Sequence, residues 1–488
     1  MSWKDAAEPV LTRMPTVQRP EGHVPFKRKL AWTAGILMVY FFLTNINPFG
    51  LAVGQSSDFF GQFRSILAGQ QGSLLQVGIG PIVTASIVLQ LLGGANLLGL
   101  DTNDPRDQVL YQGLQKLLVV IVAALTAAPM VFGGGFLPAD PKVAQALGVS
   151  IFAVQSLIFL QVFIGGILVL FMDEIVSKWG VGSGVGLFII ASVSQQIVGG
   201  FFSWSALGRT GFFASWYGIL FGSLEIGSVF TSQGLQNLLF SPGNLLAAFT
   251  TIFIFVVVVY AESVRVEIPL SHARVKGARG RFPVKLIYAS VLPMILVRAL
   301  QANIQFLGQI LNRTWAGMPT WLGVYQQGQP VSGLFYYLNP VQQPTQWMWF
   351  LGEAAAEPWM IAIRVTIDLT VMVVGGAIFA IFWVETTDMG PEATAKQIQN
   401  SGMQIPGFRQ NPQVVEKVME RYIPQVTVIG GALVGFLAVM ANMLGTVGGV
   451  SGTGLLLAVS ITYKLYEEIA EEQLMEMHPM MRQMFGSE

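Results

Sequence analysis

Residues 73–92 read SLLQVGIGPIVTASIVLQLL and contain no charged side chain. About 20 mostly apolar residues are enough for an α-helix to cross the hydrocarbon core of a bilayer. This stretch is therefore predicted to contain a membrane-spanning helix, and the sequence on both sides of it decides how many more there are.

The composition of the whole chain points the same way. Of 488 residues, 53% are hydrophobic and only 11% are charged, whereas a soluble domain carries about 25% charged residues. The 20 Met and 54 Gly residues suit adaptable or closely packed membrane interiors. Cysteine is absent, which excludes disulfides, thiolate nucleophiles and cysteine metal sites. The formal net charge is zero, so no overall field attracts a polyanion and direct DNA binding is not expected.

Uncharged apolar stretches predict ten spans and an all-α polytopic membrane protein. The last stretch is long enough for two spans, divided near residues 442–452, and Arg298 interrupts the seventh span. The stretches are residues 30–51, 73–93, 117–139, 143–172, 179–208, 244–261, 286–310, 360–384 and 422–463.

Ten spans place both chain ends on one side, and most of the 27 Lys and Arg residues then fall on that side. The positive-inside rule makes this side cytoplasmic. It comprises the N-terminal segment 1–28, two large loops at about 262–285 and 385–421, and the tail 469–488. The charge of the loops is explained either by topology alone or by docking of a large acidic or anionic partner. The acidic residues from Glu467 onward are interpreted as a solvated face, with salt adaptation as an open alternative.

Residues 55–69 (QSSDFFGQFRSILAG) are amphipathic but too short and too polar to span the bilayer. Such backbone survives at membrane depth only where protein buries it or where it lines an aqueous cavity. This segment is predicted to be a re-entrant helix.

The sequence offers little for catalysis. His23, His272 and His478 lie on separate segments, and neither a metal site, a catalytic residue nor a cofactor is predicted. Arg364 and Asp368 are four residues apart in the eighth span and are predicted to pair with each other. An enzyme is therefore not expected; a secondary solute transporter with inverted repeats remains the alternative.

The stretch quoted first resembles the first signature of the SecY family. Further stretches resemble its archaeal branch, and the similarity runs along essentially the whole chain. They are LFMDEIVSKWGVGSGVGLFI (170–189), FWVETTD (382–388), GMQIPGFR (402–409) and GTGLLLAVS (452–460).

The resemblance implies two inverted, pseudo-symmetric five-helix halves, residues 29–207 and 244–468, with an external connection at 208–243. It implies a ring of apolar side chains at the pore waist, a plug at about 56–67, and a lateral gate between spans two and seven. The implied pore-ring residues are Ile79, Val83, Val185, Ile189, Ile295 and Leu457. The plug residues are Ser57, Phe59, Phe60, Phe63 and Ile66. The gate residues are Thr84, Asn303 and, where the family often has Glu, Thr126.

The implied function is that of the central subunit of a protein-conducting channel, which passes secretory polypeptides and releases transmembrane segments into lipid. Arg274, Lys276 and Arg409 match positions that dock the ribosome. The other implied partners are SecE-like and small beta-type subunits, signal peptides, nascent polypeptides, the lipid bilayer and a signal-recognition-particle receptor. The expected location is the cell membrane, with both termini cytoplasmic.

Overall fold

The computed structural model describes most of the chain. The residues outside the description are 1–2, 23, 53–62, 95–97, 100–103, 134–135, 205–210, 222–231, 241–242, 273–278, 287–291, 316, 327, 352–355, 388, 401–402, 405–411 and 478–488.

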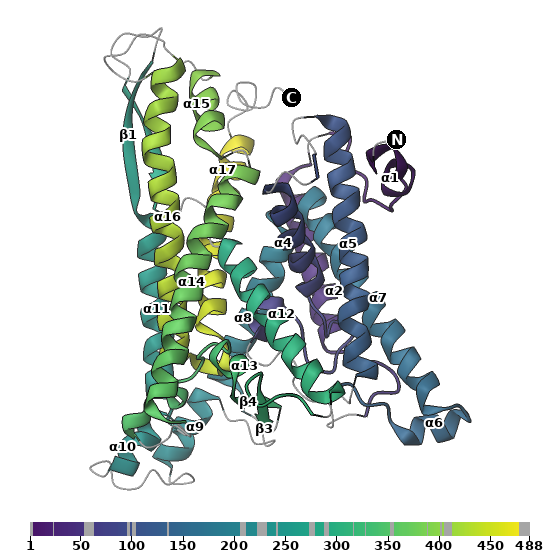
Figure 1. Cartoon of the computed structure of the whole chain (residues 1–488). Coiled ribbons are helices and arrows are strands. Elements are labelled where there is room, and N and C mark those ends of the chain that lie inside the picture. The colour runs from purple at the N-terminus through teal and green to yellow at the C-terminus, as the bar shows by residue number, and fades with distance from the viewer. Residues whose placement is uncertain are drawn as a thin grey trace.

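Ten long helices form the body of the molecule (Figure 1), as the sequence predicts. They are α2 (Phe26–Thr44), α4 (Gly80–Gly94), α5 (Pro105–Phe132), α7 (Ile151–Trp179), α8 (Gly184–Phe202), α11 (Leu245–Ser263), α12 (Leu292–Thr314), α14 (Pro358–Thr386), α16 (Pro412–Leu444) and α17 (Gly452–Met477). Within the described residues, seven of these are long and apolar enough to be recognised as spans by hydropathy alone. The other three are α4, which is shorter, and α2 and α17, which carry charged residues toward one end.

The helices fall into two sets of five with the same pattern of neighbours. In the first set α4 packs on α5, α5 on α7, and α7 on α2 and α8. In the second set α12 packs on α14, α14 on α16, and α16 on α11 and α17. The molecule therefore has the predicted architecture of two five-helix halves.

The second span begins later than predicted. Residues 73–79 form turns, in which Gly78 has a φ of +57° and the amide of Ile79 donates to the carbonyl of Leu67 at 2.8 Å. A residue with positive φ cannot continue a right-handed helix, and glycine adopts this conformation readily. The helical part of the signature thus starts at Gly80.

Other spans are longer than the uncharged stretches that predicted them. Helix α5 begins at Pro105, where the Asp104 carboxylate accepts from the amide of Arg106 at 3.0 Å and caps the helix. Helix α16 begins at Pro412, inside the segment interpreted as a loop. Charged residues end a bilayer span but not the backbone hydrogen bonding of a helix, so such helices continue beyond the membrane.

The two large loops fold together. Strands β1 (Arg265–His272) and β2 (Arg279–Lys285) form an antiparallel hairpin, and β5 (Met403–Gln404) pairs with β1. Helix α15 (Pro391–Asn400) packs against α16. These elements lie at one end of the bundle (Figure 1).

The acidic end of α17 lies at the same end of the bundle as the start of α2. Glu472 pairs with Lys29, Glu467 pairs with Lys285, and the Glu476 carboxylate accepts from the amide of Phe26 at 2.6 Å. The interpretation of this acidic stretch as a solvated face alone is therefore wrong. Helix α1 (Trp3–Leu11) packs on α5 at this end, where Lys4 pairs with Asp107 at 2.7 Å.

Further short elements complete the fold, and those that Figure 1 labels lie at the opposite end of the bundle. The short elements are α3 (Arg64–Leu67), α6 (Pro141–Leu147), α9 (Phe212–Leu220), α10 (Ser232–Leu239), β3 (Val324–Gln326), β4 (Gln329–Ser332), α13 (Leu334–Tyr337), η2 (Pro344–Gln346), η3 (Trp349–Leu351) and η4 (Val447–Gly449).

Candidate functional site

The short helix α3 lies between the two halves, in contact with α8 of the first half and with α12 and α17 of the second. Ser65 Oγ lies 2.8 Å from Ser451 Oγ, at the start of α17. A Cβ added at Gly454 would lie 2.7 Å from Ser65 Oγ, so α17 needs glycine at this point. The Tyr40 hydroxyl donates to the carbonyl of Ala68 at 2.8 Å and holds the end of α3.

Two of the five predicted plug residues are described, and both are buried. Phe63 precedes α3 and Ile66 lies within it, 6% and 1% exposed. Ser57, Phe59 and Phe60 lie outside the described residues. The described part of the predicted re-entrant segment, residues 63–69, thus lies inside the helix bundle.

All six predicted ring residues, like Ile66, belong to the large hydrophobic core that both halves share. Five of them are at most 5% exposed, and Val185 is partly buried against this core. We call these seven side chains the central cluster: Ile66, Ile79, Val83, Val185, Ile189, Ile295 and Leu457. These seven side chains are part of a larger core, and they come from both halves and from α3.

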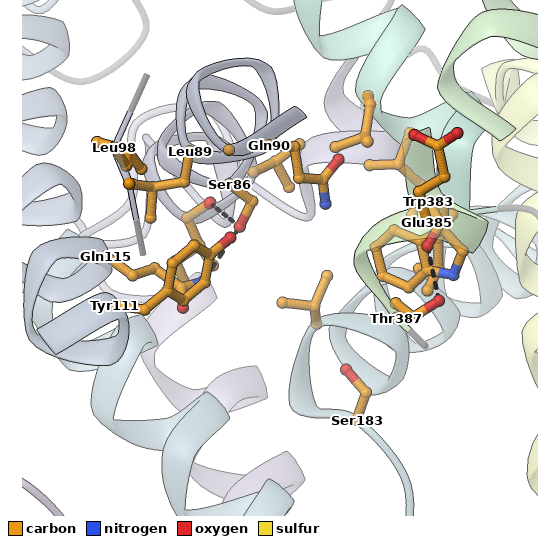
Figure 2. A pocket seen from close by; sticks show the side chains of 18 residues that line it. Ser86, Leu89, Gln90, Leu98, Tyr111, Gln115, Ser183, Trp383, Glu385 and Thr387 are labelled. Carbon is orange, nitrogen blue, oxygen red and sulfur yellow. Dashed lines mark hydrogen bonds between the residues drawn. The ribbon is translucent and has the colours of Figure 1, made fainter. Parts of the chain in front are cut away.

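A cavity of about 580 Å³ borders the central cluster. Val83, Val185 and Ile295 line it, together with residues of α4, α5, α8, α12 and α14 (Figure 2). Its polar lining includes Glu385 and Thr387 at the end of α14, and Ser183 just before α8. The cavity therefore faces the end of the bundle at which the termini lie.

The sequence analysis did not identify the polar wall of this cavity. Ser86 and Gln90 lie one helical turn apart on α4, and Gln115 of α5 donates to Ser86 Oγ at 3.2 Å. Gln90 is 7% exposed and its Oε1 has no hydrogen-bond partner among the described residues. Ser86 and Gln90, two polar residues at helical spacing in a mostly apolar span, were the signal available in the sequence.

Two of the three predicted gate residues meet. Asn303 Nδ2 of α12 donates to Thr84 Oγ1 of α4 at 3.1 Å, and this bond crosses from one half to the other. The Thr126 hydroxyl instead donates to the carbonyl of Val122 in its own helix at 2.8 Å. The seam between α4 and α12 is therefore joined by Thr84 and Asn303, without the Thr126 hydroxyl.

The predicted pairing of Arg364 with Asp368 is wrong. Asp368 Oδ1 accepts from Arg298 Nη1 at 3.0 Å, with both side chains 1% exposed. Arg364 instead donates to the backbone carbonyls of Asn339 and Pro340. Proximity along one helix suggested the first pair, whereas packing of α12 against α14 brings Arg298 to the carboxylate.

Arg298 also connects further helices of the second half. Its Nη1 donates to Gln301 at 2.6 Å and its Nε to Thr453 Oγ1 of α17 at 3.1 Å. Thr453 Oγ1 also accepts from Asn442 of α16 at 3.0 Å. This polar network ties α12 to α14, α16 and α17, so α12 belongs mechanically to the second half.

A second seam joins the halves through α8, α17 and η4. A Cβ added at Gly200 would lie 2.3 Å from the Cα of Gly448, and one at Gly186 would lie 2.9 Å from Cγ2 of Ile461. Backbones approach this closely only where small residues permit it. The amide of Val447 also donates to Thr251 Oγ1 of α11 at 3.1 Å.

The three basic residues predicted to dock the ribosome, Arg274, Lys276 and Arg409, lie outside the described residues. Of the three histidines, His272 ends β1, while His23 and His478 lie outside the description.

Comparison with known proteins assigns the family. A family model described as SecY matches residues 73–466, and one described as the plug domain of Sec61p matches residues 38–72. The chain is 74% identical to the protein translocase subunit SecY of Haloferax volcanii, over 100% of both chains. It is 51% identical to that of Archaeoglobus fulgidus, over 99% of both.

The solved structures that this chain resembles are of channels of the same kind. One described as a protein conducting channel has a TM-score of 0.79 at 37% identity, covering 97% of this chain and 98% of the other. Sec61 from the canine ribosome-channel complex of the endoplasmic reticulum has a TM-score of 0.76 at 37% identity, with the same coverage. The chain belongs to the SecY family.

Proposed function

We propose that the central cluster closes a polypeptide path between the two halves, and that the chain serves as the central subunit of a protein-conducting channel. One observation carries this proposal: Val83 and Val185 of the first half and Ile295 of the second line one cavity, while the short helix α3 contacts helices of both halves. Family membership and the similar solved structures support a channel over the alternative of a secondary transporter.

The chemistry of the central cluster suits a seal for a channel of this kind. Its aliphatic side chains offer no oxygen or nitrogen to an ion that must lose its water, so a narrow constriction of this type blocks leakage. The same side chains demand no particular hydrogen bond from an extended polypeptide. The cluster can therefore fit around chains of any sequence, which rings of carbonyls or carboxylates would not allow.

The seam between α4 and α12 is the proposed lateral gate. Thr84 and Asn303 join it with one side-chain hydrogen bond, and the cavity reaches it from the side that bears the termini. A segment in the open seam would partition by transfer free energy, at about −0.3 to −0.6 kcal/mol for each Leu, Ile, Phe or Val and about +2.5 to +3.5 kcal/mol for a central charge. Apolar segments would leave for the lipid, and polar ones would continue through.

The partners and the orientation follow from the family and the charge distribution. We assign both termini to the cytoplasm by the positive-inside rule, in the cell membrane. Arg274, Lys276 and Arg409, which belong to the two large cytoplasmic loops of the sequence, are proposed to contact the ribosome. A channel of this family with a ribosome is among the similar solved structures. SecE-like and small beta-type subunits and a signal-recognition-particle receptor complete the proposed set.

Site-specific disulfide cross-linking tests the proposed path. The sequence contains no Cys, so Val83→Cys, Ile189→Cys and Ile295→Cys each introduce a single thiol. A secretory polypeptide with one Cys, stalled in transit, should form disulfides with all three. Phe253→Cys on α11 is the matched control because that side chain is 50% exposed on the outside of the bundle. A stalled chain that reacts with the control and with none of the three cluster variants would overturn the proposal.

A further inference from the structure

The connection between the two halves carries an exposed row of aromatic rings. We call Phe202, Trp204, Phe213, Tyr217 and Phe221 the aromatic stripe. Their exposed fractions run from 46% at Phe213 to 71% at Phe221. Large contiguous apolar surfaces in proteins mark contacts with another phase or another molecule. The aromatic stripe is therefore expected to contact lipid or another molecule.

The rings of the aromatic stripe touch one another. Ring centroids lie 5.2 Å apart for Phe202 and Phe213, 5.3 Å for Trp204 and Tyr217, and 4.4 Å for Tyr217 and Phe221. Phe213 and Tyr217 are four residues apart on one face of α9, and Phe221 directly follows the helix, four residues after Tyr217. Ser215 and Gly218, on the other face, are buried.

Helix α9 is fastened to the ends of two membrane spans. The amide of Gly211, just before α9, donates to the carbonyl of Ser203, just after α8, at 2.8 Å. Trp216 Nε1 donates at 2.9 Å to the carbonyl of Gly243, two residues before α11 begins. The end of α8 and the start of α11 are therefore both attached to α9. This attachment holds α9 at the depth of the span ends, where the hydrocarbon core gives way to the headgroups.

The aromatic stripe also continues the outer surface of a span. On α8, Val198 and Phe202 are one turn apart and 57% and 66% exposed, and Phe202 is the first ring of the stripe. No charged residue occurs in residues 210–221, so nothing on this segment requires bulk water. Tyr and Trp, which have apolar bodies and polar tips, concentrate at the membrane–water interface.

We propose that α9 is a lipid anchor: it lies in the bilayer interface at the end of the bundle opposite the termini, with the aromatic stripe among the headgroups and the first acyl carbons. The continuity of the stripe with the outer face of α8 favours lipid over a protein partner. The link between the two halves is then held at the membrane surface, independently of how the channel opens.

Spin labelling of the reconstituted protein tests this depth. In single-cysteine variants in lipid nanodiscs, collisions of the label with oxygen, which is soluble in lipid, are compared with collisions with a water-soluble nickel chelate. Phe213→Cys and Tyr217→Cys each remove one ring of the stripe. Phe253→Cys on α11 provides the lipid reference, Gln329→Cys in β4 the water reference, and Ser215→Cys the buried reference.

The labels at 213 and 217 should give an oxygen-to-nickel collision ratio above that at 329 and no higher than that at 253. A ratio equal to that at 329 would place the stripe in water. Low collision rates with both reagents, as at 215, would mean that protein covers the stripe. Either result overturns the proposal, and neither bears on whether the central cluster is a polypeptide path.

Discussion

The two seams between the halves differ in how closely the backbones approach. At the seam of α8 with α17 and η4, glycines bring backbone against backbone, as between Gly200 and Gly448. At the seam of α4 with α12, the hydrogen bond between Thr84 and Asn303 joins side chains, and a cavity of about 580 Å³ reaches between these helices. We propose that the first seam stays closed while the second opens.

The polar network of Arg298 determines which helices would move together if the seam between α4 and α12 opened. Because it binds α12 to α14, α16 and α17, α12 cannot leave the second half without breaking a buried ion pair. Parting of α4 from α12 then separates the two halves as intact bodies, with the glycine seam as the hinge. Changes to the network, to the hinge and to the gate test this comparison in turn.

Breaking the Arg298 network should have the largest effect. Arg298→Met and Asp368→Leu each leave a buried charge without its partner, and such losses destabilise a protein by about 3–5 kcal/mol. Thermal unfolding of the purified protein in nanodiscs measures the change as a fall in Tm. The double variant removes both charges and should unfold at a higher temperature than either single variant. Equal Tm values for the single variants and the parent would show that α12 is not held in this way.

Enlarging a hinge glycine should have an intermediate effect. In Gly200→Ala the new Cβ would lie 2.3 Å from the Cα of Gly448, and overpacking of this kind costs about 1–3 kcal/mol. Gly199→Ala is a matched control on the same helix, since nothing lies within 4 Å of its added Cβ. The control should keep the parent Tm or exceed it slightly, because Ala favours a helix over Gly. If Gly200→Ala and Gly199→Ala have the same Tm, the glycine seam is not tightly packed.

Removing the bond across the gate should have the smallest effect on stability and a visible one on gating. Thr84→Val loses one hydrogen bond, worth about 0.5–1.5 kcal/mol, which corresponds to a roughly two- to tenfold rise in the open fraction. Single-channel conductance in planar bilayers measures that fraction. Thr126→Val is the control, because the hydroxyl it removes donates to the Val122 carbonyl of its own helix. A rise for Thr126→Val as large as for Thr84→Val would contradict the assignment of the seam.

The sequence predicted the features of the fold that the bilayer requires, namely the membrane spans and the side on which the chain ends lie. A bilayer tolerates few charges, so uncharged stretches located all ten spans, and the charge asymmetry indicated that both ends lie on one side. Features set by tertiary contacts were not predicted. The partner of Asp368 is 70 residues away on another helix, and the turn before α4 depends on how Gly78 meets the chain around Leu67.

In the candidate site, too, some features could be predicted from the sequence and others only from the structure. Resemblance to a family identified Ile79 and Leu457 as ring positions, although each is an ordinary apolar residue in its local sequence. The structure places them in one cluster with Ile66, while the cavity lined by Ser86 and Gln90 depends on how α4 and α14 pack and carries no motif.

Locking each seam with a disulfide tests the central claim most directly. Thr84→Cys with Asn303→Cys places two thiols across the gate seam, and Gly186→Cys with Ile461→Cys places two across the hinge seam, in a chain that otherwise contains no Cys. Transport of a secretory protein into proteoliposomes is measured before and after oxidation, and again after reduction. Oxidation should block transport in the gate pair, reversibly, and leave it unchanged in the hinge pair. Transport that survives the gate lock, or stops only with the hinge lock, would contradict the account.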